Sequence, residues 1–503
     1  MTRRVATGAG WLYSYRWLER LLDFASIIVL ARILSPEDFG LVAIAASVVA
    51  IIEGLSAFDV QKALIRSRDD DRALYDSAWT LSTLRGLVAA LVMVAVAAVL
   101  ATSLEDGQLA AVIFVLAASP LMEGLTNPRF VRFERDLVYS KLAILTLGSK
   151  IAAVAVTLGL AFAYRSYWAL VVGILVGTVG RVLLSYVLEP YGPRFSRRRF
   201  GDIFAFSGWL SLTSVVTTLS METDKIIVGR FLGVADAGRY FMTQRIGVLP
   251  TRELVSPLQR LLFPSFSELQ GDLQRLRRGV LESVNVIGSL SLPAGAGFAL
   301  VAADFVPLVL GEQWIAIVPL LVVLVPYLGL RATLSMTLPC VMALGRVQLL
   351  FWVSLGYAFV HVPAFVAGTA LYGLSGAIWS IVLAGVLYSY LNAWLLQRTL
   401  GISLGEILAQ LFRPLTAVAV MIAALLLLGL LLGSPLSAAL STDLAPEGPT
   451  GAGAGLLSSW ALLLGKIAVG AAVYGLTLFG LWRWRGRPPG IERRLLQLRS
   501  RKP

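Results

Sequence analysis

Long apolar runs recur from one end of this chain to the other, each of the length that a helix needs to cross a bilayer. Because 57% of the residues are hydrophobic and the alternation typical of strands is absent, the sequence predicts an all-α polytopic membrane protein. Fourteen spans fit the sequence, at approximately residues 9–33, 39–62, 76–101, 108–126, 138–163, 166–188, 204–231, 239–262, 280–303, 315–341, 347–371, 374–397, 413–433 and 456–482.

The lysines and arginines are unevenly distributed between the two ends of these spans. One set of connecting segments, together with the two chain ends, holds most of the 43 basic residues. The connecting segments on the opposite side, counted with the adjoining ends of the spans, hold only four: Arg32, Arg165, Arg230 and Arg239. Under the positive-inside rule this asymmetry places both termini in the cytoplasm. Basic inner segments facing anionic lipid account for the net charge of +13, so membrane lipids are expected partners and nucleic acid is not.

One stretch of the sequence occurs twice. Residues 28–40 and 226–238 share an arginine, a leucine, an aspartate and a glycine at a single offset of 198 positions. The same offset carries Gly10-Trp11 onto Gly208-Trp209, a helix length upstream. A shared offset over this distance predicts a duplicated lobe. In each copy we expect the glycine at a tight connection between antiparallel helices and the aspartate as a cap of the second helix.

Six spans separate the two copies, so the lobes have the same orientation and are related by a pseudo-two-fold axis along the membrane normal. The predicted organisation is an N-terminal six-helix lobe at 1–190, a C-terminal six-helix lobe at 191–400, two additional transmembrane helices at 401–483 and a basic cytoplasmic tail at 484–503. Residues 434–455 are rich in Gly, Ala, Ser and Pro, which predicts a flexible outer loop.

Charged residues lie inside several of the spans, where a charge that faces lipid costs at least about 2.5 kcal/mol. In the first span Arg16, Glu19, Arg20 and Asp23 fall on one arc roughly 100° wide, so they share a helix face. This face is interpreted either as a structural ion-pair network or as the lining of a cavity. The cavity is favoured because polar positions recur on the counterpart helix of the second copy.

That counterpart, the seventh span, carries Glu222 and Lys225 on one polar face, with Asp224 nearby. The eighth span carries Arg245 and Arg252 seven residues apart, which keeps them on one face. Neither arginine has an acidic residue three or four positions away in its own helix. The tenth span contributes a further cation, at position 331.

The sequence contains no Walker A motif, no Gly-x-Ser-x-Gly, no His-Glu-x-x-His and no cluster of metal ligands. Its single cysteine, Cys340, excludes an internal disulfide, and its single histidine, His361, argues against a histidine-based metal site. We therefore expect no catalytic residue, no metal and no cofactor. A duplicated bundle with a charged interior indicates a transporter that alternates access between its lobes.

Several segments carry a family resemblance: 32–40, Asn127-Pro128-Arg129-Phe130 with 134–137, 224–233, Phe263-Pro264-Ser265-Phe266-Ser267, and Gly311-Glu312-Gln313-Trp314. With them the chain resembles the polysaccharide transporter (Wzx-like) flippases of the multidrug/oligosaccharidyl-lipid/polysaccharide exporter superfamily over roughly residues 8–433. The last two spans match that family in number only.

The resemblance implies two six-helix lobes around a central cavity. It implies a flippase in the bacterial inner (plasma) membrane that moves an undecaprenyl-diphosphate-linked oligosaccharide, a unit of lipopolysaccharide, capsule or exopolysaccharide, from the inner to the outer leaflet. Glycan polymerases and glycosyltransferases of the same pathway are expected associates. A diphosphate needs cations in a site of low dielectric constant, and cations exceed acids on the polar faces.

The candidate cationic cavity for substrate is formed by Arg16, Arg20, Lys225, Arg245, Arg252 and Arg331. An ion gradient would drive transport, with Glu19, Asp23, Glu222 and Asp224 as candidate coupling acids. Two alternatives stay open. The first is a cation-coupled multidrug exporter, and the second is a membrane glycan ligase or polymerase, which usually has long outer loops with catalytic charge.

Overall fold

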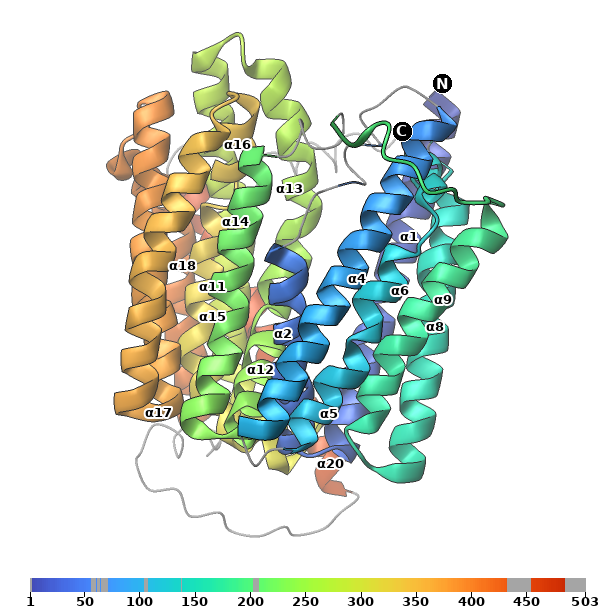
Figure 1. Cartoon of the computed structure of the whole chain (residues 1–503). Helices are drawn as coiled ribbons and strands as arrows, with labels where there is room; N and C mark the ends of the chain where they lie inside the picture. The colour runs from blue at the N-terminus through green and yellow to red at the C-terminus, as the bar shows by residue number, and fades with distance from the viewer. Residues whose placement is uncertain are drawn as a thin grey trace. The chain divides into compact units, whose positions relative to one another are not determined.

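The computed structural model describes residues 2–55, 60, 64, 71–103, 107–136, 138–201, 208–431 and 454–484. Within these residues every regular element is helical, which confirms the all-α prediction. The elements, shown in Figure 1, are α1 (Thr2–Ile33), α2 (Pro36–Leu55), α4 (Arg72–Ser103), α5 (Gly107–Leu116), α6 (Ala118–Gly124), η1 (Pro128–Phe130), α7 (Val131–Arg135), α8 (Tyr139–Tyr164), α9 (Trp168–Leu188), α11 (Gly208–Leu232), α12 (Val234–Gly247), α13 (Leu249–Leu269), α14 (Leu273–Phe305), η2 (Val306–Leu310), η3 (Glu312–Ile317), α15 (Val318–Thr333), α16 (Thr337–Ala343), α17 (Val347–Leu400), α18 (Leu404–Leu431) and α20 (Ala454–Trp484).

Ten helices of the described residues are long and apolar enough to cross a membrane. Large apolar side chains stay exposed along them, for example Phe162 at 65% and Leu371 at 73%. Lipid chains accept such a surface, whereas water penalises it. The chain is therefore a polytopic membrane protein, and the number of fourteen spans stays a prediction.

One of these ten helices, α17, contains a reversal of direction. Gly373 has φ 63° and ψ −146°, a backbone conformation that interrupts the helix and favours glycine. The hydroxyl of Ser380, after the break, donates to the carbonyl oxygen of Ala364, before it, at 2.9 Å. The two arms of α17 are therefore packed together, and the break lies between the predicted eleventh and twelfth spans.

The chain divides into two compact units, Met1–Gly238 and Arg239–Pro503. In the first unit α11 packs against α2, and α8 packs against both α1 and α9. Figure 1 shows α8 and α9 running side by side. The lobe boundaries that the repeat predicts at 190 and 400 stay predictions. Residues 434–453 of the predicted outer loop and 485–503 of the predicted tail lie outside the described residues.

The first copy of the repeated motif is a capped turn between α1 and α2. The Asp38 carboxylate accepts hydrogen bonds from the Ser35 backbone N–H and hydroxyl, both at 2.9 Å. The Asp38 N–H in turn donates to Ser35 Oγ at 3.2 Å, which completes a reciprocal N-terminal cap. The predicted capping role of this aspartate is confirmed. Its second carboxylate oxygen accepts from the Tyr167 N–H at 3.0 Å and so ties the turn to the start of α9.

The two copies of the motif pack directly on each other within the first unit. A Cβ atom added at Gly40 would lie 1.8 Å from the carbonyl oxygen of Val234, and one added at Gly238 would lie 1.9 Å from that of Pro36. Gly40 matches Gly238 and Pro36 matches Val234 at the repeat offset, so each contact is the image of the other. The motif copies are related locally by a pseudo-two-fold, and both glycines are needed for the close backbone approach.

Another segment of the family resemblance, Asn127-Pro128-Arg129-Phe130, joins the ends of several helices of the first unit. The Asn127 side chain accepts from the Arg129 N–H at 2.9 Å and donates to the carbonyl oxygens of Ser185 at 3.1 Å and Glu189 at 2.6 Å. Asn127 is fully buried, and these bonds satisfy its amide. The segment therefore anchors the end of α9.

The second unit is built around α14, which packs against α13, α15, α18 and α20. Polar contacts connect it to the last two helices at several levels: Arg277 with Glu406, Asn285 Nδ2 with the Gln410 carbonyl oxygen at 2.8 Å, the Tyr474 hydroxyl with the Ser289 carbonyl oxygen at 2.8 Å, and Lys466 with Asp304 at 2.7 Å. The apolar core of the unit continues across all of these helices, so α18 and α20 are integral to it.

Candidate functional site: a cationic pocket in the second unit

A pocket of about 360 Å³ opens within the second unit. It is enclosed by α13, the end of α15, the start of α16 and the second arm of α17. Its polar lining consists of Thr251, Arg252, Gln259, Arg331, Ser335, Tyr388, Ser389 and Asn392. The volume is within the range of small-molecule sites, and it suits a ligand head group better than a whole glycan chain.

The first wall of the pocket is formed by α13, which follows α12 after Val248. Val248 has helical backbone angles, φ −74° and ψ −27°, and Pro250 in the first turn of α13 has no backbone N–H to donate. From α13, Arg252 and Gln259 point to the pocket from positions seven residues apart. Both side chains belong to the pocket lining, while their role in binding a substrate stays a prediction. Arg245 belongs to α12 and does not line the pocket.

The opposite wall contains the second arginine, beside an aromatic ring. The guanidinium carbon of Arg331, in the last turn of α15, lies 5.6 Å from the ring centroid of Tyr388. One turn further along α17, the Asn392 side-chain nitrogen donates to the Tyr388 carbonyl oxygen at 2.8 Å. A guanidinium at this distance from an aromatic ring gains a cation–π attraction, which favours this position of Arg331. Asn392 keeps its side-chain oxygen as an acceptor.

The charge of this pocket is uniformly positive. Its lining contains Arg252 and Arg331 and no acidic side chain. Neither arginine forms an ion pair with a carboxylate of the residues that the structure describes. Two guanidinium groups without an acidic partner, inside a membrane protein, favour an anionic ligand over an apolar or cationic one.

The remaining predicted site residues belong to the first unit, except Arg245. On α1, Asp23 contacts the ammonium group of Lys150 from α8, and Arg16 Nε has no hydrogen-bond partner among the described residues. On α11, the Lys225 ammonium group lies 2.6 Å from Glu222. The other three are half-buried Glu19 and Arg20 on α1 and buried Asp224 on α11.

The pocket also contains residues that the sequence interpretation did not select. These are Tyr388, Ser389 and Asn392, which belong to a predicted span without charged residues and therefore gave no signal of a polar site. Their spacing of one turn would have indicated a shared face, but only the fold shows that this face meets Arg331. The pairing of Asp23 with Lys150 was equally invisible, because it joins two helices far apart in the sequence.

The fold and the pocket together define a class: a polytopic helical membrane protein with a cation-lined cavity in its second unit. The chain belongs to the polysaccharide biosynthesis protein family, whose model matches residues 29–319. This match confirms the resemblance carried by the sequence segments above.

Two relatives agree with this assignment, and a solved structure has a similar fold. The chain is 24% identical over 397 residues to the lipopolysaccharide biosynthesis protein WzxC of Escherichia coli strain K12, covering 78% of this chain and 80% of WzxC. It is 26% identical over 384 residues to the succinoglycan biosynthesis transport protein ExoT of Rhizobium meliloti strain 1021, covering 75% of this chain and 76% of ExoT. Its fold is similar to that of the lipid II flippase MurJ in an inward closed conformation, with a TM-score of 0.70, 14% identity and coverage of 94% and 98%.

Proposed function

We propose that this protein is a flippase for an undecaprenyl-diphosphate-linked oligosaccharide, a unit of lipopolysaccharide, capsule or exopolysaccharide. It moves this cargo from the inner to the outer leaflet of the plasma membrane by alternating access. The observation that carries the proposal is the acid-free pocket with Arg252 and Arg331. The named functions of WzxC and ExoT and the fold shared with MurJ support it.

The pocket suits the diphosphate at the junction of lipid and sugar. A guanidinium can form two parallel N–H···O bonds to phosphate oxygens, and these bonds strengthen in an environment of low dielectric constant. The cation–π contact with Tyr388 favours a position of the Arg331 guanidinium at this pocket. Neutral groups such as Gln259 and Asn392 line the same pocket and can hydrogen-bond the hydroxyl groups of the first sugar.

Transport against a gradient needs an energy source, and we assign it to an ion gradient. Asp23 and Glu222 each contact a lysine in the first unit. Protonation or cation binding at such a carboxylate would release its lysine, which gives the ion a direct effect on helix contacts. Glu19 and Asp224 remain candidates for the same role.

The two alternative functions receive less support from the pocket. A multidrug exporter of lipophilic cations needs acidic groups at its binding site, whereas the two charged side chains of this lining, Arg252 and Arg331, are positive. A ligase or polymerase needs a group that activates a nucleophile. Ser335 and Ser389 line the pocket without an acidic or histidine side chain in its lining, so no bond-making step is proposed.

A binding measurement on the purified full-length protein tests the proposal. Farnesyl diphosphate serves as a soluble analogue of the lipid diphosphate, and farnesol serves as the uncharged comparison. Arg252→Ala and Arg331→Ala should each weaken farnesyl diphosphate binding about tenfold, the loss of one charge-assisted contact. Arg346→Ala removes an exposed arginine outside the pocket lining and should leave the affinity unchanged. Equal binding of diphosphate and alcohol, or unchanged affinity in both pocket variants, would overturn the proposal.

A further inference from the structure

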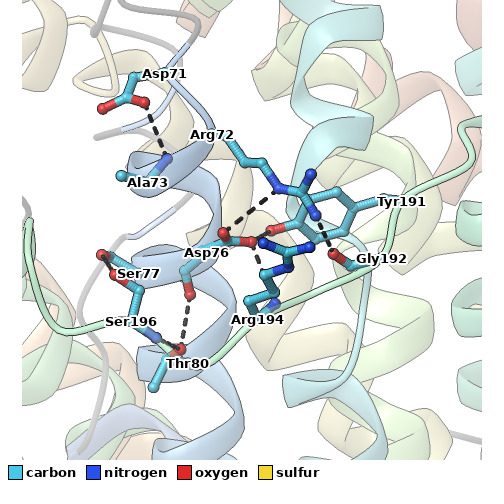
Figure 2. A network of polar contacts seen from close by, with 10 residues as sticks. All are labelled: Asp71, Arg72, Ala73, Asp76, Ser77, Thr80, Tyr191, Gly192, Arg194 and Ser196. Atoms are coloured by element: carbon cyan, nitrogen blue, oxygen red, sulfur yellow. Dashed lines mark hydrogen bonds and ion pairs between the residues drawn. The ribbon is translucent and has the colours of Figure 1, made fainter.

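The connection that follows α9 is fixed against the start of α4. It comprises residues 191–200, the 191–200 segment, which has no regular helix or strand up to residue 199. Figure 2 shows how α4 side chains hold its backbone. The contacts are Arg72 Nη2 to the Gly192 carbonyl oxygen at 3.1 Å, the Arg194 N–H to Asp76 Oδ1 at 3.3 Å, the Ser196 N–H to Thr80 Oγ1 at 3.0 Å and the Arg199 N–H to Ser77 Oγ at 3.3 Å.

A buried polar contact secures the beginning of the segment. The Tyr191 hydroxyl donates to the carboxylate of Asp76, which is 6% exposed. Burial, and then the hydrogen bond and negative charge of Asp76, hold the pKa of Tyr191 above its ordinary value, so the hydroxyl stays a donor. The guanidinium carbon of Arg129 lies 5.1 Å from the Tyr191 ring centroid and 5.6 Å from that of Tyr75. The segment is therefore attached to the unit by its backbone and by Tyr191.

The side chains left free by these contacts are cationic and aromatic. Arg194, Arg197 and Arg198 are exposed. Phe195 is 78% exposed although its ring meets the edge of Trp79 at a centroid distance of 5.3 Å. No acidic residue occurs between positions 190 and 201.

The nearest acidic residue before the segment is already engaged. Glu189 lies 3.3 Å from Arg132 and 3.9 Å from Lys141. Within the residues that the structure describes, no ion pair joins Arg194, Arg197 or Arg198 to a carboxylate. These arginines also lie near the ends of two helices that can cross the membrane, since α9 ends at Leu188 and α4 begins at Arg72.

We propose that the 191–200 segment binds anionic phospholipid head groups of the leaflet at this end of the unit, which the charge distribution predicts to be the inner leaflet. The arginines contact lipid phosphates, and Phe195 lies among the upper acyl chains. A lipid surface is favoured over a soluble acidic partner because an exposed phenylalanine accompanies the arginines at the ends of transmembrane helices. This inference is independent of the pocket and its cargo.

A fluorescence experiment on the full-length protein tests the inference. The one native cysteine, Cys340, is buried and is replaced by serine. Gly192→Cys then provides a labelling site, since Gly192 is exposed and a Cβ there meets no atom within 4 Å. The labelled protein is reconstituted into phosphatidylcholine vesicles that contain nitroxide-labelled phosphatidylglycerol or the same fraction of nitroxide-labelled phosphatidylcholine. We expect the anionic quencher to be roughly twofold or more as effective, because the segment enriches it locally.

Two triple variants provide the comparison. Arg194→Gln/Arg197→Gln/Arg198→Gln should abolish the preference for the anionic quencher. Arg275→Gln/Arg278→Gln/Arg346→Gln removes the same charge from exposed positions of the second unit and should keep the preference. Equal quenching by the two lipids in the parent protein, or an unchanged preference in the first triple variant, would overturn the inference. The arginines would then be assigned to an acidic protein partner.

Discussion

Arg252 combines three properties that make it the most informative single residue. It lines the pocket, it has no carboxylate partner among the described residues, and it lies in the first turn of a helix whose N-terminus contains Pro250. Arg252→Ala should abolish glycan export in cells while leaving the protein inserted at its normal level. Arg252→Lys should retain partial export, because lysine keeps the charge but loses the bidentate geometry that suits a phosphate.

Export is measured as surface glycan in a strain that lacks the chromosomal gene, with the amount of membrane protein determined in parallel. Arg245→Ala is the matched comparison, since Arg245 belongs to α12 and does not line the pocket. Its effect should be weaker than that of Arg252→Ala. Full export by Arg252→Ala at normal protein level would show that this arginine does not hold the cargo.

Lys466 and Asp304 form an ion pair, although they are far apart in the sequence. The side chains are 6% and 16% exposed, and the ammonium and carboxylate groups lie 2.7 Å apart. Removing one partner leaves the other buried and unpaired, which typically costs about 3 kcal/mol or more. Lys466→Met should therefore lower the thermal unfolding midpoint in detergent clearly, and Lys466→Met/Asp304→Leu should recover much of the loss.

An exposed ion pair of the same unit is the control. Arg275 and Asp272 lie 3.2 Å apart with side chains 74% and 50% exposed, so solvent screens their attraction. Arg275→Met should change the unfolding midpoint little. The unfolding midpoint of the double variant is compared with those of Lys466→Met and Asp304→Leu alone. If the double variant lost as much as the sum of the two single losses, Lys466 and Asp304 would not act as a pair.

The reciprocal contact between α2 and the α11–α12 connection explains why the repeated stretch keeps glycine in both copies. Each glycine lets the carbonyl oxygen of the other copy's turn approach its backbone. Gly40→Ala and Gly238→Ala should each destabilise the protein by about 1–3 kcal/mol, because the added methyl group must displace backbone. Thermal unfolding in detergent measures the effect.

Gly356→Ala is the matched control for these two variants. Gly356 is exposed within α17, and a Cβ there meets no atom within 4 Å. Alanine is the better helix former, so this change should be neutral or slightly stabilising. If Gly40→Ala were equally neutral, the close approach of the two turns would not exist in the folded protein.

Parts of this arrangement could be predicted from sequence because they depend on local order. The cap at Asp38 follows from the spacing of Ser35 and Asp38, and the shared face of Arg252 and Gln259 follows from helical periodicity. The partners of Arg252 across the pocket could not be predicted, because periodicity does not say which helices meet. Arg245 shares the same periodicity, yet it belongs to α12 and does not line the pocket.

The segments that carry the family resemblance illustrate the same limit. They identified the family correctly, yet two of their residues are structural in the described part of the chain. Asn127 anchors the end of α9 by hydrogen bonds, and Trp314 is fully buried in the second unit. A family motif therefore indicates the fold without indicating the substrate site.

For the molecule as a whole, the repeat makes a prediction about symmetry. Residues 9–188 should superpose on roughly 204–397 by a rotation near 180° about the membrane normal. The reciprocal contact of Gly40 and Gly238 supports this relation locally. A structure in which the matched spans run in opposite directions would contradict the prediction and make the repeat an inverted one.

The number of membrane crossings depends on α17, the longest helix of the described residues. At about 1.5 Å per residue, its 54 residues would extend for about 81 Å, far more than the roughly 30 Å of a hydrocarbon core. The break at Gly373 instead divides it into two arms of ordinary length. We therefore predict that α17 crosses the membrane twice, so that Gly345 and Gly401, on either side of it, lie on the same side.

Reporter fusions of alkaline phosphatase and green fluorescent protein at five glycines measure this directly. Fusions at Gly271, Gly345 and Gly401 should report the cytoplasm, whereas fusions at Gly311 and Gly373 should report the outside. The pair Gly271 and Gly311 is the internal control, since a single apolar helical stretch, Leu273–Leu310, separates them. Opposite sides for Gly345 and Gly401 would mean that α17 crosses once. Fourteen crossings with both termini in the cytoplasm would then no longer fit the chain.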